Sequence, residues 1–313
     1  MRAVKQFDCL ERFEIEGEAS VHLAIGMFDG LHVGHKKVIE SAIATADESG
    51  VCGVLTFWPH PSRLFNPGNP TRMISTPEIK RRELGNSNIY FEIEQPFSKE
   101  FAAVEADQFV KMLKDRIPKL ASVHTGENWR FGKGRLGDAA MLQSLCRSEG
   151  IEARVVSCEM SGGERVSSTR IRSCLTVGDI GKANDLLGYP YYSIGTVVQG
   201  RRMGRTIDVP TLNLPFEGDL QPAFGVYAVY ARDVASDKRF MGVANFGVKP
   251  TVGAERRPLL EAHLLEPCVF DYGNRLAVEW LKFLRPEEKF DSFDVLKAQI
   301  QKDIDDTKRY FGI

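Results

Sequence analysis

Two histidines, His32 and His35, end a glycine-rich stretch at residues 25–35, Ile-Gly-Met-Phe-Asp-Gly-Leu-His-Val-Gly-His. Histidines three residues apart share one face of a helical turn, so both rings could reach a single phosphate group. The same pair could instead be zinc ligands, or belong to a turn whose polar groups are satisfied within the protein. Gly26 and Gly34 would let a ligand approach the backbone closely. The stretch therefore predicts a site that handles phosphate.

The segments on either side of this stretch would hold the histidines in place. Residues 21–25 form a short apolar run typical of a buried strand, and residues 36–49 carry apolar side chains at the spacing of one helix face. A strand, a tight turn and a helix start would point free backbone N–H groups and the positive end of the helix dipole at an anion. The expected local structure thus agrees with a phosphate site.

A second strand, at residues 51–57, is followed by Trp-Pro-His-Pro, with His60 between the prolines. Helical patterns at residues 74–84 and 106–113 then alternate with strand patterns at residues 89–93 and 120–125. Strands that alternate with helices predict a parallel, doubly wound α/β sheet, and ligands bind such sheets outside the carboxyl ends of the strands. His60 would lie at that edge, although prolines can fix such a turn without any ligand.

Aromatic rings and cations gather at residues 126–135, Gly-Glu-Asn-Trp-Arg-Phe-Gly-Lys-Gly-Arg, which follow the expected strand at residues 120–125. This composition suits an aromatic ligand that bears phosphates, and the amide of Asn128 adds a polar contact. An exposed basic loop would have the same composition. Both interpretations stay open on the residues alone.

Hydroxyl and guanidinium groups gather at residues 166–172, Val-Ser-Ser-Thr-Arg-Ile-Arg. Ser168 and Thr169 can donate hydrogen bonds to phosphate oxygens, and Arg172 adds a charged donor. Serine and threonine also commonly cap helices. The two roles are compatible, because a capped helix N-terminus is itself an anion site.

The second part of the chain changes character after residue 187. Strand-like alternations recur at residues 194–198, 224–230, 240–246, 262–265 and 276–283, and residues 286–311 end in an amphipathic helical pattern. Such spacing predicts a compact antiparallel barrel. We therefore expect two domains, residues 1–187 and residues 188–313.

Composition sets broad limits on the class of protein. The chain has 313 residues, 43% hydrophobic and 27% charged, which is typical of a folded protein with a core. A net charge of −1 argues against broad nucleic-acid binding. We find no signal-peptide pattern, no apolar run that could span a membrane and no CxxC pair among six cysteines, so we expect a cytoplasmic protein with reduced thiols.

Four motifs in the first half, taken in chain order, resemble one family. Residues 26–35, Gly-x-Phe-Asp-Gly-x-His-x-Gly-His, are similar to the signature of the bacterial bifunctional riboflavin kinase/FAD synthetases. The Pro-His-Pro, Gly-Glu-Asn and Ser-Ser-Thr motifs match the same family, and residues 200–213, 242–251 and 261–265 resemble its riboflavin kinase module. The resemblance covers the chain from about residue 20 to residue 311, and it implies a Rossmann-like nucleotidyltransferase domain followed by a β-barrel kinase domain with a C-terminal helix.

The resemblance implies that the first domain converts FMN into FAD, by attack of the FMN phosphate on the α-phosphorus of ATP. His32 and His35 would bind the ATP phosphates, and Arg172 with Ser168 and Thr169 would stabilise the leaving pyrophosphate. Asn128 would contact phosphate or flavin. The remaining nucleotide- or flavin-binding residues implied here are Gly26, Phe28, Asp29, Gly34 and His60.

The resemblance implies that the second domain phosphorylates riboflavin to FMN, with Glu261 as the base that accepts the proton of the ribityl hydroxyl. Thr211 and Asn213 are two residues apart and offer oxygens, the ligands that Mg²⁺ prefers beside phosphates. A Pro-Thr-x-Asn segment can also be a simple turn, and Glu261 an ordinary strand residue. The other binding residues implied are Gly200, Gly204, Arg205 and Asn245.

The chain departs from its family at Asp208-Val209, where Gly-Phe is usual, and at residues 267–273, where the usual acidic stretch is altered. A carboxylate beside ATP phosphates would repel them unless a cation compensates. We therefore keep two alternatives: an FMN adenylyltransferase with an impaired kinase module, and a non-catalytic flavin or nucleotide sensor. The expected partners are riboflavin, FMN, ATP and Mg²⁺, with no nucleic acid or membrane, in a monomer or weak homo-oligomer.

Overall fold

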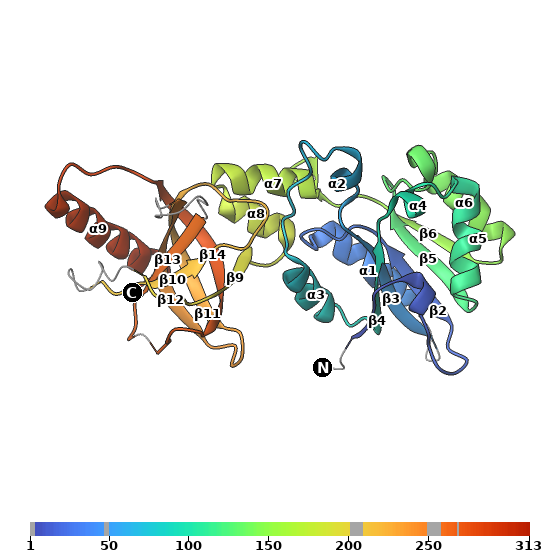
Figure 1. Cartoon of the computed structure of the whole chain (residues 1–313), viewed down its shortest axis with the longest axis horizontal. Coiled ribbons are helices and arrows are strands. Elements are labelled where there is room, and N and C mark those ends of the chain that lie inside the picture. Colours follow the sequence, from blue (N-terminus) through green and yellow to red (C-terminus); the bar gives the residue numbers. More distant parts are fainter. Residues whose placement is uncertain (1–3, 47–49, 201–208, 249–257, 268) are drawn as a thin grey trace. The chain divides into compact units, whose positions relative to one another are not determined.

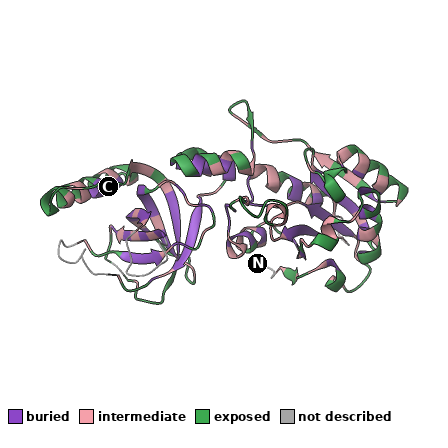
Figure 2. Ribbon diagram, turned by 45° about the horizontal axis from the view of Figure 1, so that its top comes forward, coloured by how far each residue is buried: buried purple, intermediate pink, exposed green. Residues whose placement is uncertain are grey.

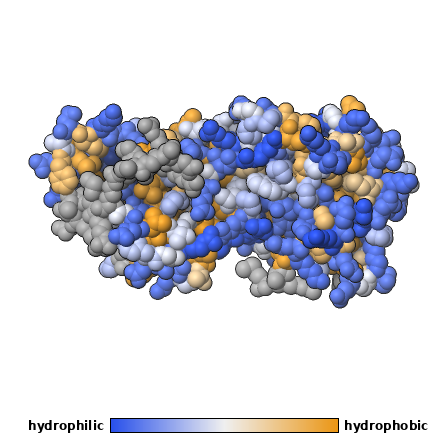
Figure 3. Space-filling model, in the orientation of Figure 1, coloured by the Kyte–Doolittle hydropathy of each residue, from blue (hydrophilic) through white to orange (hydrophobic). Residues whose placement is uncertain are grey.

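The computed structural model describes residues 4–46, 50–200, 209–248, 258–267 and 269–313. The chain divides into two compact units, Met1–Ser168 and Thr169–Ile313, and each has its own sheet (Figure 1). Among the described residues, no helix is both long enough and apolar enough to cross a bilayer. The face drawn in Figure 3 is mostly hydrophilic, with scattered hydrophobic patches.

The first unit is built on a six-stranded sheet whose paired strands all run parallel. In spatial order the strands are β1 (Lys5–Phe7), β4 (Phe91–Pro96), β3 (Val51–Trp58), β2 (Val21–Ile25), β5 (Leu120–Gly126) and β6 (Glu152–Val156). The chain winds outward from β2 to β4 on one side and from β5 to β6 on the other. The order therefore reverses between β2 and β5, the switch point where doubly wound sheets bind ligands, and the expected fold class is confirmed.

Helices cover both faces of this sheet (Figure 1). One face packs against α1 (Val33–Thr45) and α3 (Pro77–Gly85), and the other packs against α5 (Ala106–Arg116) and α6 (Ala139–Ser148). The shorter elements are α2 (Pro61–Phe65), α4 (Lys99–Ala102), the 3₁₀ turns Leu10–Arg12 and Lys133–Arg135, and the hairpin of β7 (Met160–Ser161) and β8 (Glu164–Arg165). Buried apolar side chains fill both interfaces, so the sheet has two cores.

Local sequence explains where these helices begin. The side chain of Thr76 caps α3 by accepting from the backbone N–H of Ile79 at 3.3 Å, and Pro77 follows as the first helical residue, as its fixed φ angle favours. Helix α1 was expected from Lys36, and that start is wrong by three residues. It begins at Val33 because the side chain of His32 caps it.

A buried polar chain lies between the sheet and α1. The side chains of Ser20, His22, Ser122, His124 and Ser41 are linked in that order by hydrogen bonds of 3.0, 2.8, 2.8 and 2.9 Å. His124 is fully buried, and burial, assisted by the charge of Arg154, lowers the pKa of its ring to about 4. His124 is therefore neutral at pH 7 and relies on the two serine hydroxyls.

The second unit contains an antiparallel barrel in the strand order β10 (Leu212–Pro215), β13 (Pro258–Leu264), β12 (Arg239–Val248), β11 (Gly225–Asp233), β14 (Arg275–Pro286) and β9 (Tyr192–Thr196). Val198 and Asn213 form an isolated bridge between the chain just after β9 and β10, the two ends of that order. This bridge nearly closes the sheet on itself, and the expected barrel is confirmed. The helices α7 (Ser168–Val177) and α8 (Ile180–Leu187) precede it.

The barrel interior is aromatic. Trp280 is fully buried and packs edge-on against Tyr227 and Phe246, with ring centroids 4.6 and 5.1 Å apart. In Figure 2 the buried colour follows the strands of this sheet. These rings pack against one another in the core of the barrel.

The last helix, α9 (Phe293–Phe311), lies on the outside of the barrel over β11 and β12. Ile304 packs there with Val226 and Val243. Arg285 of β14 donates two hydrogen bonds, of 2.8 and 2.7 Å, to the buried carboxylate of Asp303. Such a paired, bidentate contact fixes the helix on the barrel.

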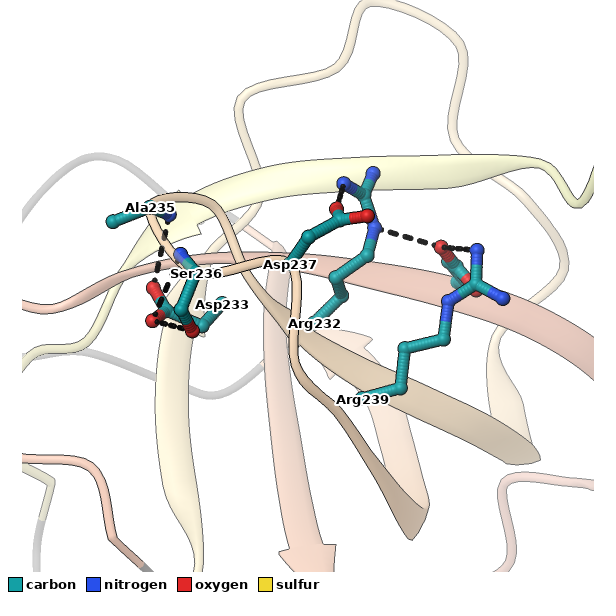
Figure 4. Close-up of polar contacts among 7 residues, drawn as sticks. Arg232, Asp233, Ala235, Ser236, Asp237 and Arg239 are labelled. Carbon is teal, nitrogen blue, oxygen red and sulfur yellow. Dashed lines mark hydrogen bonds and ion pairs between the residues drawn. The ribbon is translucent and has the colours of Figure 1, made fainter.

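A buried carboxylate also anchors the turn between β11 and β12. Glu279 is almost fully buried and accepts hydrogen bonds from Arg232 at 2.8 Å, while Arg239 lies 3.2 Å from it. Arg232 reaches onward to Asp237 in the turn, as Figure 4 shows. Two guanidinium groups thus compensate the one buried charge.

Candidate active sites

The turn after β2 places both histidines at the start of α1. Nδ1 of His32 accepts a hydrogen bond from the backbone N–H of His35 at 3.2 Å. Because that nitrogen accepts, the neutral ring must carry its proton on Nε2, which makes Nε2 a hydrogen-bond donor. His32 is 6% exposed, so its ring is held firmly.

The two imidazole rings stack, with centroids 3.6 Å apart and planes 14° from parallel. The expectation that His32 and His35 share one face is confirmed. Phe28 meets the ring of His35 edge-on at 5.5 Å. A Cβ atom at Gly34 would come within 3.2 Å of the ring of His32, so the glycine between the histidines makes room for the stack.

The loop that precedes the histidines has an unusual backbone. Phe28, Gly30 and Leu31 have φ angles of 49°, 77° and 34°, and Phe28 and Leu31 are both buried. Left-handed conformations at non-glycine residues are costly and persist where surrounding contacts hold them. A Cβ at Gly26 would meet the ring of Phe28 at 3.2 Å, so the glycine lets this ring fold back under the loop.

Asp29 supplies one of those contacts. It is 2% exposed, and its carboxylate accepts hydrogen bonds from the backbone N–H groups of Ile74 and Ser75, at 3.0 and 3.2 Å. The carboxylate therefore joins the histidine loop to the segment that leads into α3. Direct contact of Asp29 with a nucleotide stays a prediction, while its place in the structure is that of a positioning residue.

A buried lysine, Lys80, is connected to the same loop through Thr56. Nζ of Lys80, on α3, lies 3.3 Å from the hydroxyl of Thr56 and 3.0 Å from the carboxylate of Glu94. The hydroxyl of Thr56 in turn donates to the carbonyl of Met27 at 3.1 Å. Lys80 thus links α3 to β3 and β4 and, through the hydroxyl of Thr56, to the histidine loop.

Three of the sequence motifs meet around one cavity of about 940 Å³ in the first unit. Met27 reaches it from the histidine loop, His60 from the turn after β3 and Asn128 from the turn after β5. His60 caps α2, since its Nδ1 accepts from the backbone N–H of Ser62 at 3.1 Å. The interpretation of Pro-His-Pro as a structural turn agrees with this cap, and the expectation that the turn and the histidine loop line one cavity is confirmed, while ligand binding by His60 stays a prediction.

Seven of the residues that line this cavity are phenylalanine or tryptophan. Trp129 and Phe131 stack with centroids 4.9 Å apart and planes 13° from parallel, and Phe97 contacts Phe101 and Phe65 edge-on. Phe65 is 68% exposed at the rim. Aromatic walls of this kind are suited to contact with a planar ring.

Two of the three cations in the loop at residues 126–135 form ion pairs within the protein. Arg130 lies 3.2 Å from Asp138, and Lys133 lies 2.6 Å from Glu105. These pairs are exposed and contribute little to stability. They do hold the loop beside the cavity, where Asn128 donates from Nδ2 to the sulfur of Cys158 at 2.8 Å. Cys158 belongs to no motif that the sequence analysis identified.

The hydroxyl–arginine motif straddles the boundary between the units. Ser168 is the first residue of α7, and its hydroxyl donates to the carbonyl of Asp29 at 2.9 Å. The structure thus joins Ser168 to the histidine loop. Thr169 and Arg172 fall in the second unit, three residues apart on α7 and therefore on one face of it.

In the barrel, three candidate residues from separate motifs lie in one row. Asn213 of β10 is directly opposite Glu261 of β13, which is directly opposite Asn245 of β12. Directly paired residues of antiparallel strands project to the same face, so these side chains are neighbours. Glu261 and Asn245 are partly exposed, and Asn213 is 8% exposed.

Oxygen donors are available at this row for a divalent cation. Asn213 donates from Nδ2 to the carbonyl of Thr211 at 3.4 Å, which leaves Oδ1 as an acceptor, and Thr211 is exposed. Gly200 packs against that amide, because a Cβ there would lie 2.3 Å from Nδ2. Among the described residues, no cluster of three or more His, Cys, Asp or Glu side chains could hold a metal ion.

Three residues that the sequence analysis named in this half lie outside the described residues: Gly204, Arg205 and Asp208. Gly247, which follows Asn245 by two residues, lies against the carboxylate of Glu287. Nδ2 of Asn245 is 3.5 Å from the same carboxylate. Glu287 is thus a further carboxylate beside the row, and no sequence motif pointed to it.

Comparison with known proteins places both sites in context. The family model described as FAD synthetase matches residues 15–170, and the one described as riboflavin kinase matches residues 187–311. The bifunctional riboflavin kinase/FMN adenylyltransferases of Escherichia coli K12 and Bacillus subtilis 168 are 34% and 33% identical to the chain. The alignments cover 93% of this chain and 93% of the Escherichia coli protein, and 95% and 94% for Bacillus subtilis.

A solved structure is also similar over nearly the whole chain. It is titled a macrolide-efflux protein from Streptococcus pneumoniae, and it is 28% identical, with a TM-score of 0.86. The match covers 97% of this chain and 98% of that one. On the strength of both family models and of relatives aligned over nearly their full length, the chain belongs to the family of bifunctional riboflavin kinase/FMN adenylyltransferases.

Proposed function

We propose that the chain makes FAD from riboflavin in two ATP-dependent steps, one at each site. The barrel phosphorylates riboflavin to FMN, and the α/β unit adenylylates FMN to FAD with release of pyrophosphate. The observation that carries the proposal is the separate assembly of each site: stacked histidines beside an aromatic cavity in the first unit, and an Asn–Glu–Asn row on the barrel.

In the first unit, adenylyl transfer needs positioning and charge neutralisation, with no covalent intermediate. An oxygen of the FMN phosphate attacks the α-phosphorus of ATP, and the bond to the bridging oxygen of the leaving pyrophosphate breaks. The backbone N–H groups at the start of α1 and the Nε2–H of His32 are donors suited to the phosphate oxygens. His35 stacks on His32 and supplies a second ring at the same face.

The aromatic cavity suits the flavin of FMN. Its volume of about 940 Å³ is at the upper end of small-molecule sites, and Trp129, Phe97 and Phe101 offer ring faces and edges to an isoalloxazine. We assign Asn128, which lines the cavity, to contact with the phosphate or the flavin end of the ligand. The hydroxyl of Ser168 is hydrogen-bonded to the carbonyl of Asp29 in the histidine loop. We assign Ser168, Thr169 and Arg172 to the binding of the leaving pyrophosphate.

In the barrel, we assign Glu261 as the base that accepts the proton of the ribityl hydroxyl while its oxygen attacks the γ-phosphorus of ATP. The products are FMN and ADP. Thr211 and Asn213 would hold Mg²⁺, which supplies charge neutralisation to the phosphates when bound. Asn245, on the other side of Glu261, is placed to orient the base or the flavin substrate.

The domains that we propose are residues 1–187 for adenylyl transfer and residues 188–313 for the kinase. The first family model ends at residue 170 and the second begins at residue 187, while the compact units meet at Ser168 and Thr169. Most of α7 and α8 thus lies between the two family models.

The test is a time course with the full chain. Riboflavin and Mg²⁺–ATP are incubated with the protein, and riboflavin, FMN and FAD are separated by chromatography. The proposal expects FMN to rise first and FAD to follow, and it expects FAD when FMN is supplied directly. FAD from FMN without riboflavin phosphorylation would identify an adenylyltransferase with an impaired kinase. Binding of flavin with neither product would identify a sensor.

A further inference from the structure

Cys158 and Glu159, which belong to none of the sequence motifs, follow the carboxyl end of β6 next to the adenylyl-transfer site. Strands β5 and β6 stay paired up to Gly126 and Val156, and the backbone N–H of Glu127 still donates to the carbonyl of Val156 at 3.0 Å. Asn128 and Cys158 each lie two residues beyond that last pair. The parallel strands therefore deliver the two side chains to the same edge of the sheet.

The side chains of Asn128 and Cys158 meet there. Nδ2 of Asn128 lies 2.8 Å from Sγ of Cys158. Within the described part of the chain, the Asn128 side chain forms no other hydrogen bond. Asn128 itself is exposed, whereas Cys158 is half-buried. An exposed amide has several accessible rotamers, so the contact with a fixed thiol selects one orientation.

The thiol is suited to this structural contact. Partial burial and a hydrogen bond to the neighbouring carboxylate of Glu127 raise the pKa of Cys158, against the smaller opposite effect of Asn128, so the thiol stays protonated at neutral pH. A protonated thiol can accept from the amide N–H, and it can also donate to the amide oxygen. A hydroxyl group at the same place could do both as well.

The segment that carries Cys158 is anchored to the histidine site. Glu159 forms an ion pair with Lys37 of α1, and its carbonyl accepts from the backbone N–H of Val166 at 2.8 Å. Its Cβ would lie 3.8 Å from a Cβ placed at Gly34, between the two histidines. The segment thus contacts α1 on one side and Asn128 on the other.

We propose that Cys158 is a positioning residue for adenylyl transfer, which holds the amide of Asn128 at a fixed distance from the stacked histidines. The inference rests on the proposed function of the first unit and adds a residue to it. Cys158 contacts no substrate in this proposal. Cys158 acts through Asn128. The ion pair between Glu159 and Lys37 holds the backbone of the Cys158 segment beside α1.

A packing role for Cys158 is the competing explanation, and isosteric substitutions separate the two. Threonine and valine have the same shape, but only threonine carries a hydroxyl. Cys158→Thr should therefore retain the contact with Asn128, and Cys158→Val should lose it. Cys158→Ser and Cys158→Ala offer the same contrast without added bulk, should the branched residues fail to fold.

The experiment measures FAD formation from FMN and Mg²⁺–ATP by the full chain, with riboflavin phosphorylation by the same sample as an internal control. We expect Cys158→Val to lower kcat/KM for FMN about tenfold, the factor for loss of one hydrogen bond of about 1.4 kcal/mol. Cys158→Thr should stay within about twofold of the unchanged protein. Equal activities of the two variants, whether both high or both low, would assign Cys158 to packing and overturn the proposal.

A double-mutant cycle with Asn128 completes the test. Because Cys158 acts through Asn128, Cys158→Val should cause no further loss in a chain that already carries Asn128→Ala. Losses that multiply would mean that Cys158 acts by another route, against the proposal. If the unchanged protein makes no FAD from FMN, the proposed function itself fails, a result distinct from an active protein that is indifferent to Cys158→Val.

Discussion

The backbone N–H of His35 donates to Nδ1 of His32 at 3.2 Å, so the second histidine of the motif orients the first. The same N–H also donates to the backbone carbonyl of His32 at 2.8 Å, so one donor is shared between the helix turn and the imidazole, and Nδ1 is fixed as an acceptor. The pattern His-x-Gly-His is therefore a structural unit as well as a pair of ligands. Its parts can be tested separately.

Replacing His32 with asparagine separates the cap from the ligand. Asparagine is a good N-cap, so His32→Asn should keep thermal stability, whereas His32→Ala should lose about 1 kcal/mol. Both variants should lower FAD formation by roughly a hundredfold or more, about 2.7 kcal/mol of transition-state stabilisation. Steady-state assays with FMN and calorimetry on the same samples check this. Full FAD synthesis by His32→Asn would make the ring dispensable.

The glycine between the histidines offers a second test. A Cβ at Gly34 would lie 3.2 Å from the ring of His32, so Gly34→Ala should displace the ring and lower FAD formation about tenfold or more. Alanine is also more favourable than glycine within a helix by about 0.5–1 kcal/mol. This gain should offset part of the strain, so the free energy of unfolding should change less than the activity does.

Gly181 provides the matched control. It is likewise the second residue of a helix, α8, and a Cβ there would meet no atom within 4 Å. Gly181→Ala should raise stability slightly and leave both activities unchanged. Identical activity losses in the two variants would contradict the steric explanation at Gly34.

Glu261 is the residue whose removal should stop the kinase. Glu261→Gln keeps the shape and polarity of the side chain but cannot accept a proton, so riboflavin phosphorylation should fall by about 10²–10⁴-fold. FAD formation from supplied FMN should persist, because it occurs in the other unit. Glu266, an exposed carboxylate just beyond β13, is the control, and Glu266→Gln should have little effect. A fully active Glu261→Gln would assign the base elsewhere.

His124 should make the first unit sensitive to acid. Burial lowers the pKa of its ring from 6.5 to about 4, so between these values the unfolded chain binds a proton that the folded chain does not. Stability is therefore present above pH 6.5 and lost as the pH falls towards 4, by about 2 kcal/mol at pH 5. Unfolding of the first unit at pH 7 and pH 5 should show a smaller difference for His124→Gln. An unchanged difference would place the acid sensitivity in other groups.

The boundary of the barrel domain can be tested by truncation. The side chain of Asn184, on α8, donates to the carbonyl of Trp280 and accepts from the backbone N–H of Tyr191, at 2.9 and 2.7 Å. Residues 188–313 lack these contacts, so we expect them to phosphorylate riboflavin but to melt at a lower temperature than residues 169–313. Calorimetry of both fragments checks this. A folded but inert fragment of residues 169–313 would mean that the kinase needs the first unit.

The sequence predicted the elements with strong patterns and missed those without. Buried strands such as β2 and β3 were correct because their apolar runs reflect burial on both faces. Strands β1 and β6 lie at the two edges of the sheet and have partly exposed, mixed sequences, so no periodicity marks them. Helix α6 was also missed, although its first turn has a regular cap at Asp138.

Among the candidate site residues, too, those within recognisable motifs were predicted and those outside motifs were missed. Motifs identified His32, His35, Asn213 and Glu261 as candidates, and the structure places the two histidines beside each other and Asn213 opposite Glu261. Cys158 and Lys80 were not, because each acts through a neighbour that is distant in sequence, Asn128 or Thr56. Contacts of that kind depend on strand register and helix packing, which only the folded chain defines.

The order of pairing in the barrel bears on how the chain folds during its synthesis. Strand β9 pairs with β14, Tyr192 opposite Glu279, so the barrel cannot assemble until β14 has left the ribosome. The last strand of the first sheet, β6, ends at Val156, in the middle of the chain. We therefore expect nascent chains to acquire a folded FAD-forming unit about half a chain length before they have a kinase.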